Sequence, residues 1–390
     1  MAKDQRVLVV GGGGRVGLQI ASELLRQSFS VAIADVLPEE LLWQRGGRTL
    51  NDARIAAGDN VGELCVSGGV DVLNVDALAE IITREQPDLV INYAIPITWD
   101  ATKTLPNYHR VSAAGLGAFT PIQVLAPLCV ARAMRESGLS APLMVGNLPD
   151  ITIPVLTGIA ANEELPKPVC GAGNVALNQI AFQRQIAVDL GVDMTEVELR
   201  LCSHHVHWVA PREPGYSNEA PFLADVVVNG AMQEMKLEAL REQMNRGVQA
   251  FYESGAAFSS TTGILASRVA MAFLDRSGAA HHLHAPAPNG LPGGYPVKIS
   301  NGEISLDLPE RWDLADAVQK MQKCHTYDGV ETIKDDGSVV FTESARKILA
   351  AELDFILPTE MSPPDIETVA SAQIEVVGRA LDKARAKATG

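Results

Sequence analysis

A glycine-rich turn between an apolar run and a helical pattern opens the chain, in RVLVVGGGGRVGLQIASELLRQS at residues 6–28. Gly12, Gly14 and Gly17 have the spacing G-x-G-x-x-G, and Gly11 with the latter two has the spacing G-x-x-G-x-x-G. Glycine at these places lets the chain turn tightly, lets a ligand approach the backbone, and lets the helix pack closely on the strand. The spacing therefore predicts the first strand–turn–helix unit of a doubly wound parallel sheet.

The helix after this turn and the strand that follows it predict a dinucleotide site. The first backbone N–H groups of the helix, at Arg15 and Val16, and the positive end of its dipole favour phosphate groups. The second strand, SVAIAD, ends in Asp35, whose carboxylate is placed to bind the ribose hydroxyls of adenosine. Because Asp35 would repel a 2′-phosphate, the predicted cofactor is NAD rather than NADP. A glycine-rich turn that binds no nucleotide is the alternative.

The stretch GGVDVLNVDALAEIITREQPDLVINYAIP, at residues 68–96, resembles the extended short-chain dehydrogenases. In that family an Asp-Val pair before such a helix borders the adenine, and an Asn-x-Ala at the end of the next strand lines the cofactor. The residues at these positions are Asp71, Val72, Asn92 and Ala94. The catalytic Tyr-x-x-x-Lys of the family is missing, because Tyr108 is followed four residues later by Ser112. The resemblance thus implies cofactor binding without that family's proton-transfer chemistry.

The second half of the chain resembles a different group, the lactate and malate dehydrogenases and the related family 4 glycosidases. The segment APLMVGNLPDITIPVLTG resembles their Asn-Pro-Val-Asp segment, which implies that Asn147 contacts the substrate or the nicotinamide. In VELRLCSHHVHWV, His205 matches the position of the functional histidine. The segment AFSSTTGILASRVAMAFLDRSG resembles the helix whose first residues face the substrate, which implies a substrate contact for Ser260. This resemblance covers most of the chain from Asn147 to about Met321.

Several residues depart from this second resemblance. The aspartate that orients the histidine and the arginine that binds a substrate carboxylate are replaced by Asn178 and Ala181. We therefore expect Asn178 to serve as a polar partner in the site, together with Asn174, which lies four residues earlier on the same helix face. Positive charge for the substrate is expected instead from the loop DATKTLPNYHR, through Lys103, His109 and Arg110. The cysteine that ligates a metal in the glycosidases is replaced by Ala176, so no metal ligands are assigned.

The histidine run at residues 204–207 allows more than one role. If LRLCSHHVHWV is a strand, His205 and His207 share one face and His204 lies on the other. His205 is then the predicted catalytic acid and base, since the ordinary pKa of histidine suits proton transfer near neutrality. Metal ligation and a structural role are its alternatives. His207 is expected either to assist it or to pack, and His204 to lie in the core. The second run, HHLH at residues 281–284, is expected at a surface or subunit contact.

Composition and charge limit the classes of partner. A net charge of -15 argues against nucleic acid and anionic membranes, since both would repel the chain. We find no apolar run of the roughly 20 residues that a membrane span needs and no signal peptide. Five scattered cysteines without a C-x-x-C pair suit a cytoplasmic protein with free thiols. The expected partners are a small-molecule substrate and, as both resembled groups imply, further copies of the chain in a dimer or tetramer.

These observations predict an α/β protein with a doubly wound Rossmann domain over residues 1–155 and a mixed α/β substrate domain over residues 156–390. The expected function is NAD-dependent hydride transfer between nicotinamide and a secondary alcohol or ketone of a small polar substrate. One alternative is an NAD-requiring glycosidase or lyase, with or without a metal. The other is a non-catalytic protein that senses NAD, in which the fold is kept and the chemistry is lost.

Overall fold

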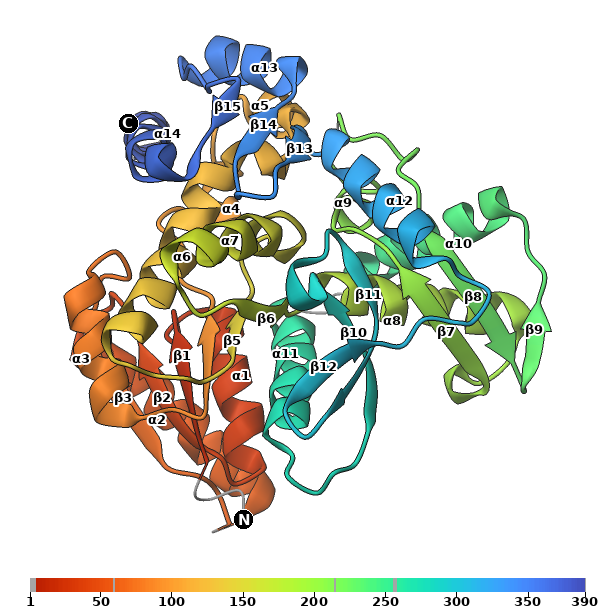
Figure 1. Ribbon diagram of the computed structural model, residues 1–390, viewed down its shortest axis with the longest axis horizontal. Helices are drawn as coiled ribbons and strands as arrows, with labels where there is room; N and C mark the ends of the chain where they lie inside the picture. The colour runs from red at the N-terminus through yellow and green to blue at the C-terminus, as the bar shows by residue number, and fades with distance from the viewer. Residues whose placement is uncertain (1–4, 59, 214, 255–257, 390) are drawn as a thin grey trace.

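A six-stranded parallel sheet forms the first half of the computed structural model, which describes residues 5–58, 60–213, 215–254 and 258–389 (Figure 1). Its strand order is β3-β2-β1-β4-β5-β6. The strands are Arg6–Val10 (β1), Ser30–Ala34 (β2), Leu64–Ser67 (β3), Leu89–Asn92 (β4), Leu143–Val145 (β5) and Pro168–Gly171 (β6). The direction of winding reverses between β1 and β4, and ligands of such sheets bind in the crevice at the carboxyl ends of those strands.

Helices cover both faces of this sheet, as the sequence predicts. They are Arg15–Arg26 (α1), Glu39–Ala57 (α2), Val75–Glu85 (α3), Thr120–Glu136 (α6) and Pro149–Glu163 (α7). Two four-residue helices, Trp99–Thr102 (α4) and Tyr108–Val111 (α5), lie in the segment between β4 and α6. Helix α1 begins at Arg15, directly after the glycine-rich turn. The predicted doubly wound fold is therefore confirmed. The predicted boundary at residue 155 falls inside α7, and the sheet continues as far as Gly171.

Two antiparallel three-stranded sheets, four longer helices and the four-residue helix α9 come next in the described part of the chain. The sheets are β7-β8-β9 (Val197–Cys202, Leu223–Val228, Ala231–Gln233) and β10-β11-β12 (His281–Pro286, Gly294–Ser300, Glu303–Leu306). The helices are Asn174–Leu190 (α8), Val206–Val209 (α9), Leu237–Glu253 (α10), Phe258–Leu274 (α11) and Leu314–Thr326 (α12). This arrangement agrees with the predicted mixed α/β substrate domain.

The histidine run does not form the single strand that the sequence analysis assumed. Strand β7 ends at Cys202, and Ser203 makes one isolated β-bridge to Gly294. The chain then turns into the short helix α9, whose first hydrogen bonds run from Trp208 and Val209 back to the carbonyl of His205. Alternation along a strand therefore does not govern where the histidines point, and the prediction that His205 and His207 share a face was wrong.

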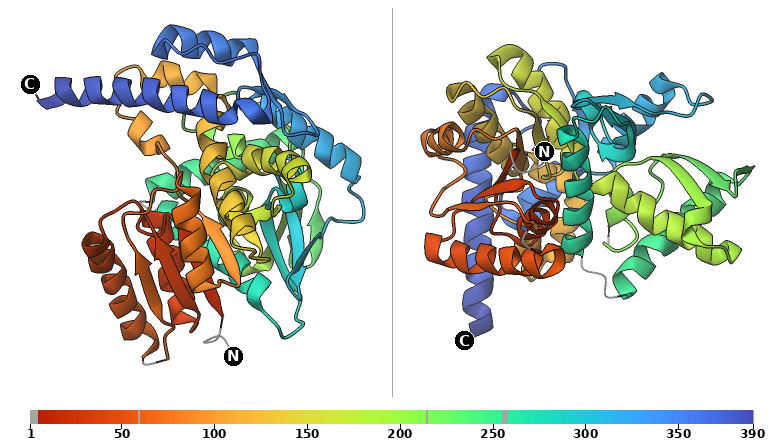
Figure 2. Two further views of the ribbon diagram at one scale, coloured as in Figure 1. Left: turned by 60° about the vertical axis from the view of Figure 1, so that its left-hand side comes forward. Right: turned by 90° about the horizontal axis from the view of Figure 1, so that it is seen from below.

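The last sixty or so residues return to the first half of the chain (Figures 1 and 2). They form a third small sheet and two helices: Val330–Ile333 (β13), Val339–Phe341 (β14), Glu360–Met361 (β15), Glu343–Leu353 (α13) and Ile366–Thr389 (α14). Helix α14 packs along α6, and its Gln373 donates a hydrogen bond to the carbonyl of Ala118. Buried Phe341 and Val377 belong to the same apolar core as Val124 of α6. Residues 156–390 are therefore not one separate body.

The helical segment Leu116–Glu136 is long and apolar, and an 18-residue window in it has a mean hydropathy of 1.4. Its length and composition match those of a membrane-spanning helix, contrary to our expectation that no such run exists. In this fold 94% of the segment's most apolar window is buried inside the protein, between the sheet and α14. Its apolar composition is thus explained by burial in the core.

The packing of α14 predicts that this helix contributes to the stability of the first half. Val377 is fully buried, so Val377→Asp places an unpaired carboxylate in the core and should lower the free energy of unfolding by about 3 kcal/mol or more. Lys383→Asp introduces the same residue at an exposed position of the same helix and should leave stability nearly unchanged. Thermal and denaturant unfolding of the two variants measure the difference. Equal stabilities would show that α14 is not part of the folded core.

Candidate active site

The glycine-rich turn has the geometry of a phosphate-binding loop. Gly11 has a φ of +81°, and its N–H donates to the carbonyl of Ala34. A Cβ atom at Gly17 would lie 2.6 Å from the carbonyl oxygen of Gly11, so only glycine allows this approach between helix and turn. Gly14 caps α1 without a side-chain hydrogen bond, which leaves the N–H groups of the first helical turn for an anion. The turn therefore fits the pyrophosphate of a dinucleotide.

The other predicted cofactor residues lie around the same crevice. Asp35 accepts hydrogen bonds from the N–H groups of Gly13 and Leu37, which fixes its carboxylate beside the turn. Val72 is buried and Asp71 is exposed. At the base of the crevice, Asn92 is fully buried and donates to the carbonyl of Ala94. These placements fit an adenosine at the β2 end and a nicotinamide beside β4.

Asn147 joins this cofactor cluster. It follows β5, its side-chain nitrogen donates to the carbonyl of Ala94, and its side-chain oxygen accepts a 2.7 Å hydrogen bond from Asn92. The side-chain oxygen of Asn92 is buried and has no hydrogen-bond partner among the described residues. The amides of Asn92 and Asn147 thus form one polar wall where the ends of β4 and β5 meet.

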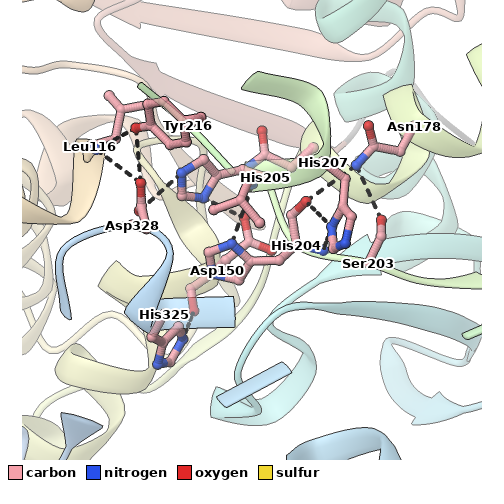
Figure 3. A network of polar contacts seen from close by, with 12 residues as sticks. Leu116, Asp150, Asn178, Ser203, His204, His205, His207, Tyr216, His325 and Asp328 are labelled. Carbon is pink, nitrogen blue, oxygen red and sulfur yellow. Dashed lines mark hydrogen bonds and ion pairs between the residues drawn. The ribbon is translucent and has the colours of Figure 1, made fainter. Parts of the chain in front are cut away.

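His205 lies between two buried carboxylates at the start of α9 (Figure 3). Its Nε2 is 3.0 Å from Oδ2 of Asp328, and its Nδ1 is 3.8 Å from Oδ2 of Asp150. Nε2 and Asp328 form an ion pair whose geometry does not meet that of a hydrogen bond. Nδ1 and Asp150 are too far apart for a hydrogen bond. Neither ring nitrogen has a hydrogen-bond partner among the described residues, and Nδ1 is the one farther from a carboxylate.

The charge of this histidine is set by the same two residues. Burial lowers the pKa of His205, but the negative charge and contact of Asp328, with a smaller contribution from Asp150, outweigh it and raise that pKa above its ordinary value. Burial raises the pKa of Asp150, and this effect is larger than the lowering of that pKa by the charge of His205. Burial thus disfavours the charged form of Asp150, whereas the neighbouring carboxylates favour the charged form of His205.

Asp328 is held by residues from two other segments. Its Oδ1 accepts a 2.9 Å hydrogen bond from the N–H of Leu116 and a 3.0 Å hydrogen bond from the hydroxyl of Tyr216. Cβ atoms at Gly115 and Gly117 would collide with the backbone of Asp328, so glycines at these positions permit its approach. Asp328 therefore has a fixed carboxylate whose second oxygen faces His205.

The sequence analysis missed Asp150, Asp328 and Tyr216. Asp150 stands in the quoted segment NLPD, three residues after Asn147, and its match to the Asp of the resembled segment was the available signal. Asp328 lies beyond the part of the chain that the resemblance covers, and Tyr216 lies in the turn region after α9. No pattern in the sequence connects these two with His205, because only the fold of the C-terminal segment brings Asp328 there.

The neighbouring histidines are structural. His204 is fully buried, as predicted, and burial lowers its pKa well below the ordinary value. His207 accepts the N–H of His204 at Nδ1, and its Nε2 lies 3.2 Å from the carbonyl of Ala220, so the neutral ring with the proton on Nε2 satisfies both contacts. Burial lowers the pKa of His207 to about 4, and that of His325, beside the carbonyl of Asp150, also to about 4.

The two predicted asparagines of α8 position these groups. Asn178 donates to the hydroxyl of Ser203 and the carbonyl of His204, which holds the turn that leads into His205. Asn174 donates a 2.6 Å hydrogen bond to Oδ2 of Asp150. Asn174 thus contacts the site carboxylate, whereas Asn178 acts through the backbone before the histidine.

The predicted substrate residues outside α8 are less closely tied to His205. Lys103 contacts Asp100 and Glu213, and Arg110 contacts Glu352 of α13, so acids neutralise both charges. His109 is exposed beside Arg110. Ser260 is half-buried in the first turn of α11. This end of α11 packs closely on α1, because a Cβ atom at Gly263, one turn after Ser260, would touch Gln19 of α1. Arg15, at the start of α1, is exposed and pairs with Asp100.

The HHLH run makes its polar contacts with residues outside this cluster. His281 and His282 each lie 2.7 Å from a carboxylate, of Asp275 and Asp307, and Nε2 of His284 accepts the N–H of Leu201. Across the part of the chain that the structure describes, no three His, Cys, Asp or Glu side chains are arranged to hold a metal ion.

Comparison with known proteins agrees with the two resemblances. Residues 7–116 match the model of the NAD-dependent epimerase/dehydratase family. A search of curated protein sequences finds no match to the chain. Over these residues the family model agrees with the predicted NAD-binding Rossmann half of the chain.

Similar solved structures are dehydrogenases. Lactate dehydrogenase from Eimeria maxima, solved with NADH and oxamate, has a TM-score of 0.55 and 16% identity, over 82% of this chain and 90% of that one. Malate dehydrogenase from Aeropyrum pernix has a TM-score of 0.51 and 14% identity, over 82% and 97%. Malate dehydrogenase from Salinibacter ruber has a TM-score of 0.51 and 17% identity, over 82% and 94%. This chain therefore has the lactate/malate dehydrogenase fold.

The buried neutral histidines predict a loss of stability in acid. The pKa values of His207 and His325 are lower in the folded protein than in the unfolded chain, so the unfolded chain binds more protons between about pH 6.5 and pH 4. Each should cost on the order of 3 kcal/mol across that window. His205 has the opposite sign, because its raised pKa stabilises the fold at low pH and that contribution is lost as the pH rises.

Unfolding measured from pH 7.5 to pH 4.5 tests this expectation. His325→Gln keeps a donor for the carbonyl of Asp150 and removes the titrating ring, so stability should fall less steeply with acid than in the unmodified protein. His282→Gln, at an exposed histidine, should leave the slope unchanged. Parallel slopes for all three proteins would contradict the assignment of His325.

Proposed function

We propose that the chain binds NAD and moves a hydride between nicotinamide and a secondary alcohol or ketone of a small polar substrate, with His205 as the acid and base. The observation that carries this proposal is the state of the His205 ring: Nε2 faces a fixed carboxylate, and Nδ1 has no hydrogen-bond partner among the described residues. Asp150, which lies beside Nδ1 of His205, follows Asn147 by three residues in the chain. Asn147 in turn is hydrogen-bonded to Asn92 in the amide wall.

The roles of the side chains follow from these contacts. Bound NAD supplies the hydride acceptor for oxidation and the hydride donor for reduction. Nδ1 of His205 takes the hydroxyl proton, and the carboxylate of Asp328 stabilises the imidazolium that forms. Asn147 can direct the second hydrogen of its amide nitrogen at the substrate oxygen, since its first is used by Ala94. His205 is 3% exposed, so the proton transfer takes place in a buried site.

The contacts of Tyr108 favour His205 over a tyrosine base. The hydroxyl of Tyr108 donates to Glu213, and burial together with that carboxylate raises its pKa. A tyrosine that serves as a base in the short-chain dehydrogenase manner needs a lysine four residues later, where this chain has Ser112. Proton transfer by Tyr108 is thus disfavoured by its own partners.

The first test replaces the proposed base. NAD⁺ and a panel of secondary alcohols are assayed by NADH absorbance, and His205→Gln should lower kcat by roughly 10²- to 10⁴-fold. NADH binding, followed by fluorescence, should stay within a few fold, because the cofactor residues are untouched. His282→Gln is the control with unchanged kcat. Near-normal turnover by His205→Gln would contradict the proposal. Conversion of the substrate without accumulation of NADH would favour the glycosidase or lyase alternative.

The second test concerns Asp328 as the positioning residue of His205. Oxidation needs neutral His205, so its rate rises with pH through the raised pKa of that histidine. Asp328→Asn removes the charge that raises the pKa, and the rise in kcat/KM should therefore move to lower pH, with kcat reduced about tenfold or more. Asp335→Asn makes the same change at an exposed position and should leave the profile in place. A merely structural Asp328 would lower kcat without moving the profile.

A further inference from the structure

The charges that face His205 are negative. Within ion-pair distance of its ring the described residues provide the carboxylates of Asp150 and Asp328, both fully buried. The cluster of these three groups carries a net positive charge only when both carboxyls are protonated. A substrate with a carboxylate next to its reacting carbon would therefore bring a third acid into a buried site that already holds two.

The nearby cations are already engaged. Arg212 donates to the carbonyl of Trp208, and its guanidinium lies 3.9 Å from the centre of the Tyr252 ring. Arg241 donates to the carbonyls of Asn218 and Ala220 and lies over the ring of Phe222. Lys103 and Arg110 are paired to acids. The contacts of these four side chains therefore leave none of them positioned to bind a substrate carboxylate at His205.

Asp150 offers an acceptor beside the proton-transfer nitrogen. Its Oδ2 accepts from Asn174 and lies 3.8 Å from Nδ1 of His205, while its Oδ1 is buried and has no hydrogen-bond partner among the described residues. A hydroxyl on the carbon next to the reacting one can donate to this oxygen. A carboxylate on that carbon cannot donate, and it would be repelled.

We infer that the substrate is an uncharged vicinal diol, or the matching hydroxyketone, rather than a 2-hydroxy acid. The inference rests on the proposed function and names the substrate class of the same site. Oxidation converts the secondary carbinol to a ketone: its C–H bond breaks with transfer of hydride to NAD⁺, and its hydroxyl proton passes to Nδ1 of His205. The neighbouring hydroxyl is not oxidised and remains bound to Asp150.

Matched pairs of probes test the inference on the unmodified protein. Propane-1,2-diol is compared with lactate, and glycerol with glycerate, at saturating NAD⁺; hydroxyacetone and pyruvate are compared with NADH. The uncharged member of each pair should have a kcat/KM at least tenfold higher, and hydroxyacetone should raise the melting temperature of the NADH complex more than pyruvate does. A preference for the acids, or neither binding nor turnover of any uncharged probe, overturns the inference.

Asp150→Asn tests whether Asp150 causes the preference for an uncharged diol. The change keeps the size of the side chain and removes its charge, so the preference for diol over hydroxy acid should fall by tenfold or more, with the melting temperature recorded as a check on folding. Asp335→Asn is the matched control with an unchanged ratio. An unchanged ratio in a folded Asp150→Asn overturns the role of Asp150. Turnover of acids that still depends on His205 would overturn this inference alone and leave the proposed function standing.

Discussion

The contact between Asp328 and His205 is the interaction on which the arrangement of the whole site depends. It joins a carboxylate that follows α12 to a histidine at the start of α9, and the same carboxylate binds the backbone of Leu116 from the first half of the chain. Three segments are thereby fixed against one another at one buried point. Because a buried carboxylate without partners is unfavourable, each of these segments constrains the positions of the other two.

The site has a histidine at the position that matches the resembled dehydrogenases, but the residues around that histidine differ. The helix α8 has Asn178 and Ala181 where the resembled dehydrogenases have an aspartate and an arginine, and its asparagine binds backbone rather than the imidazole ring. The negative charge comes instead from Asp150 and Asp328 on other elements. The role in proton transfer that we propose for His205 is thus combined with a different charge around the substrate.

Local chemistry explains which features could be predicted from the sequence. The glycine-rich turn, its strands and the position of Asp35 follow from short-range rules, so the Rossmann half was predictable. Helix α9 was not, because four residues of helix after a strand depend on the contacts of His207 with His204 and Ala220 rather than on a periodic pattern. Asp328 was not either, since its approach depends on a C-terminal segment that packs against α6 and on glycines at positions 115 and 117.

The return of the C-terminal segment to the first half has a consequence for how the molecule is made. Synthesis completes the six strands of the parallel sheet at Gly171, whereas α14, which covers α6, begins only at Ile366. Until α14 is made, the side of α6 that it covers is exposed to water. The growing chain must therefore keep an apolar helix surface from aggregating while residues 172–365 are added.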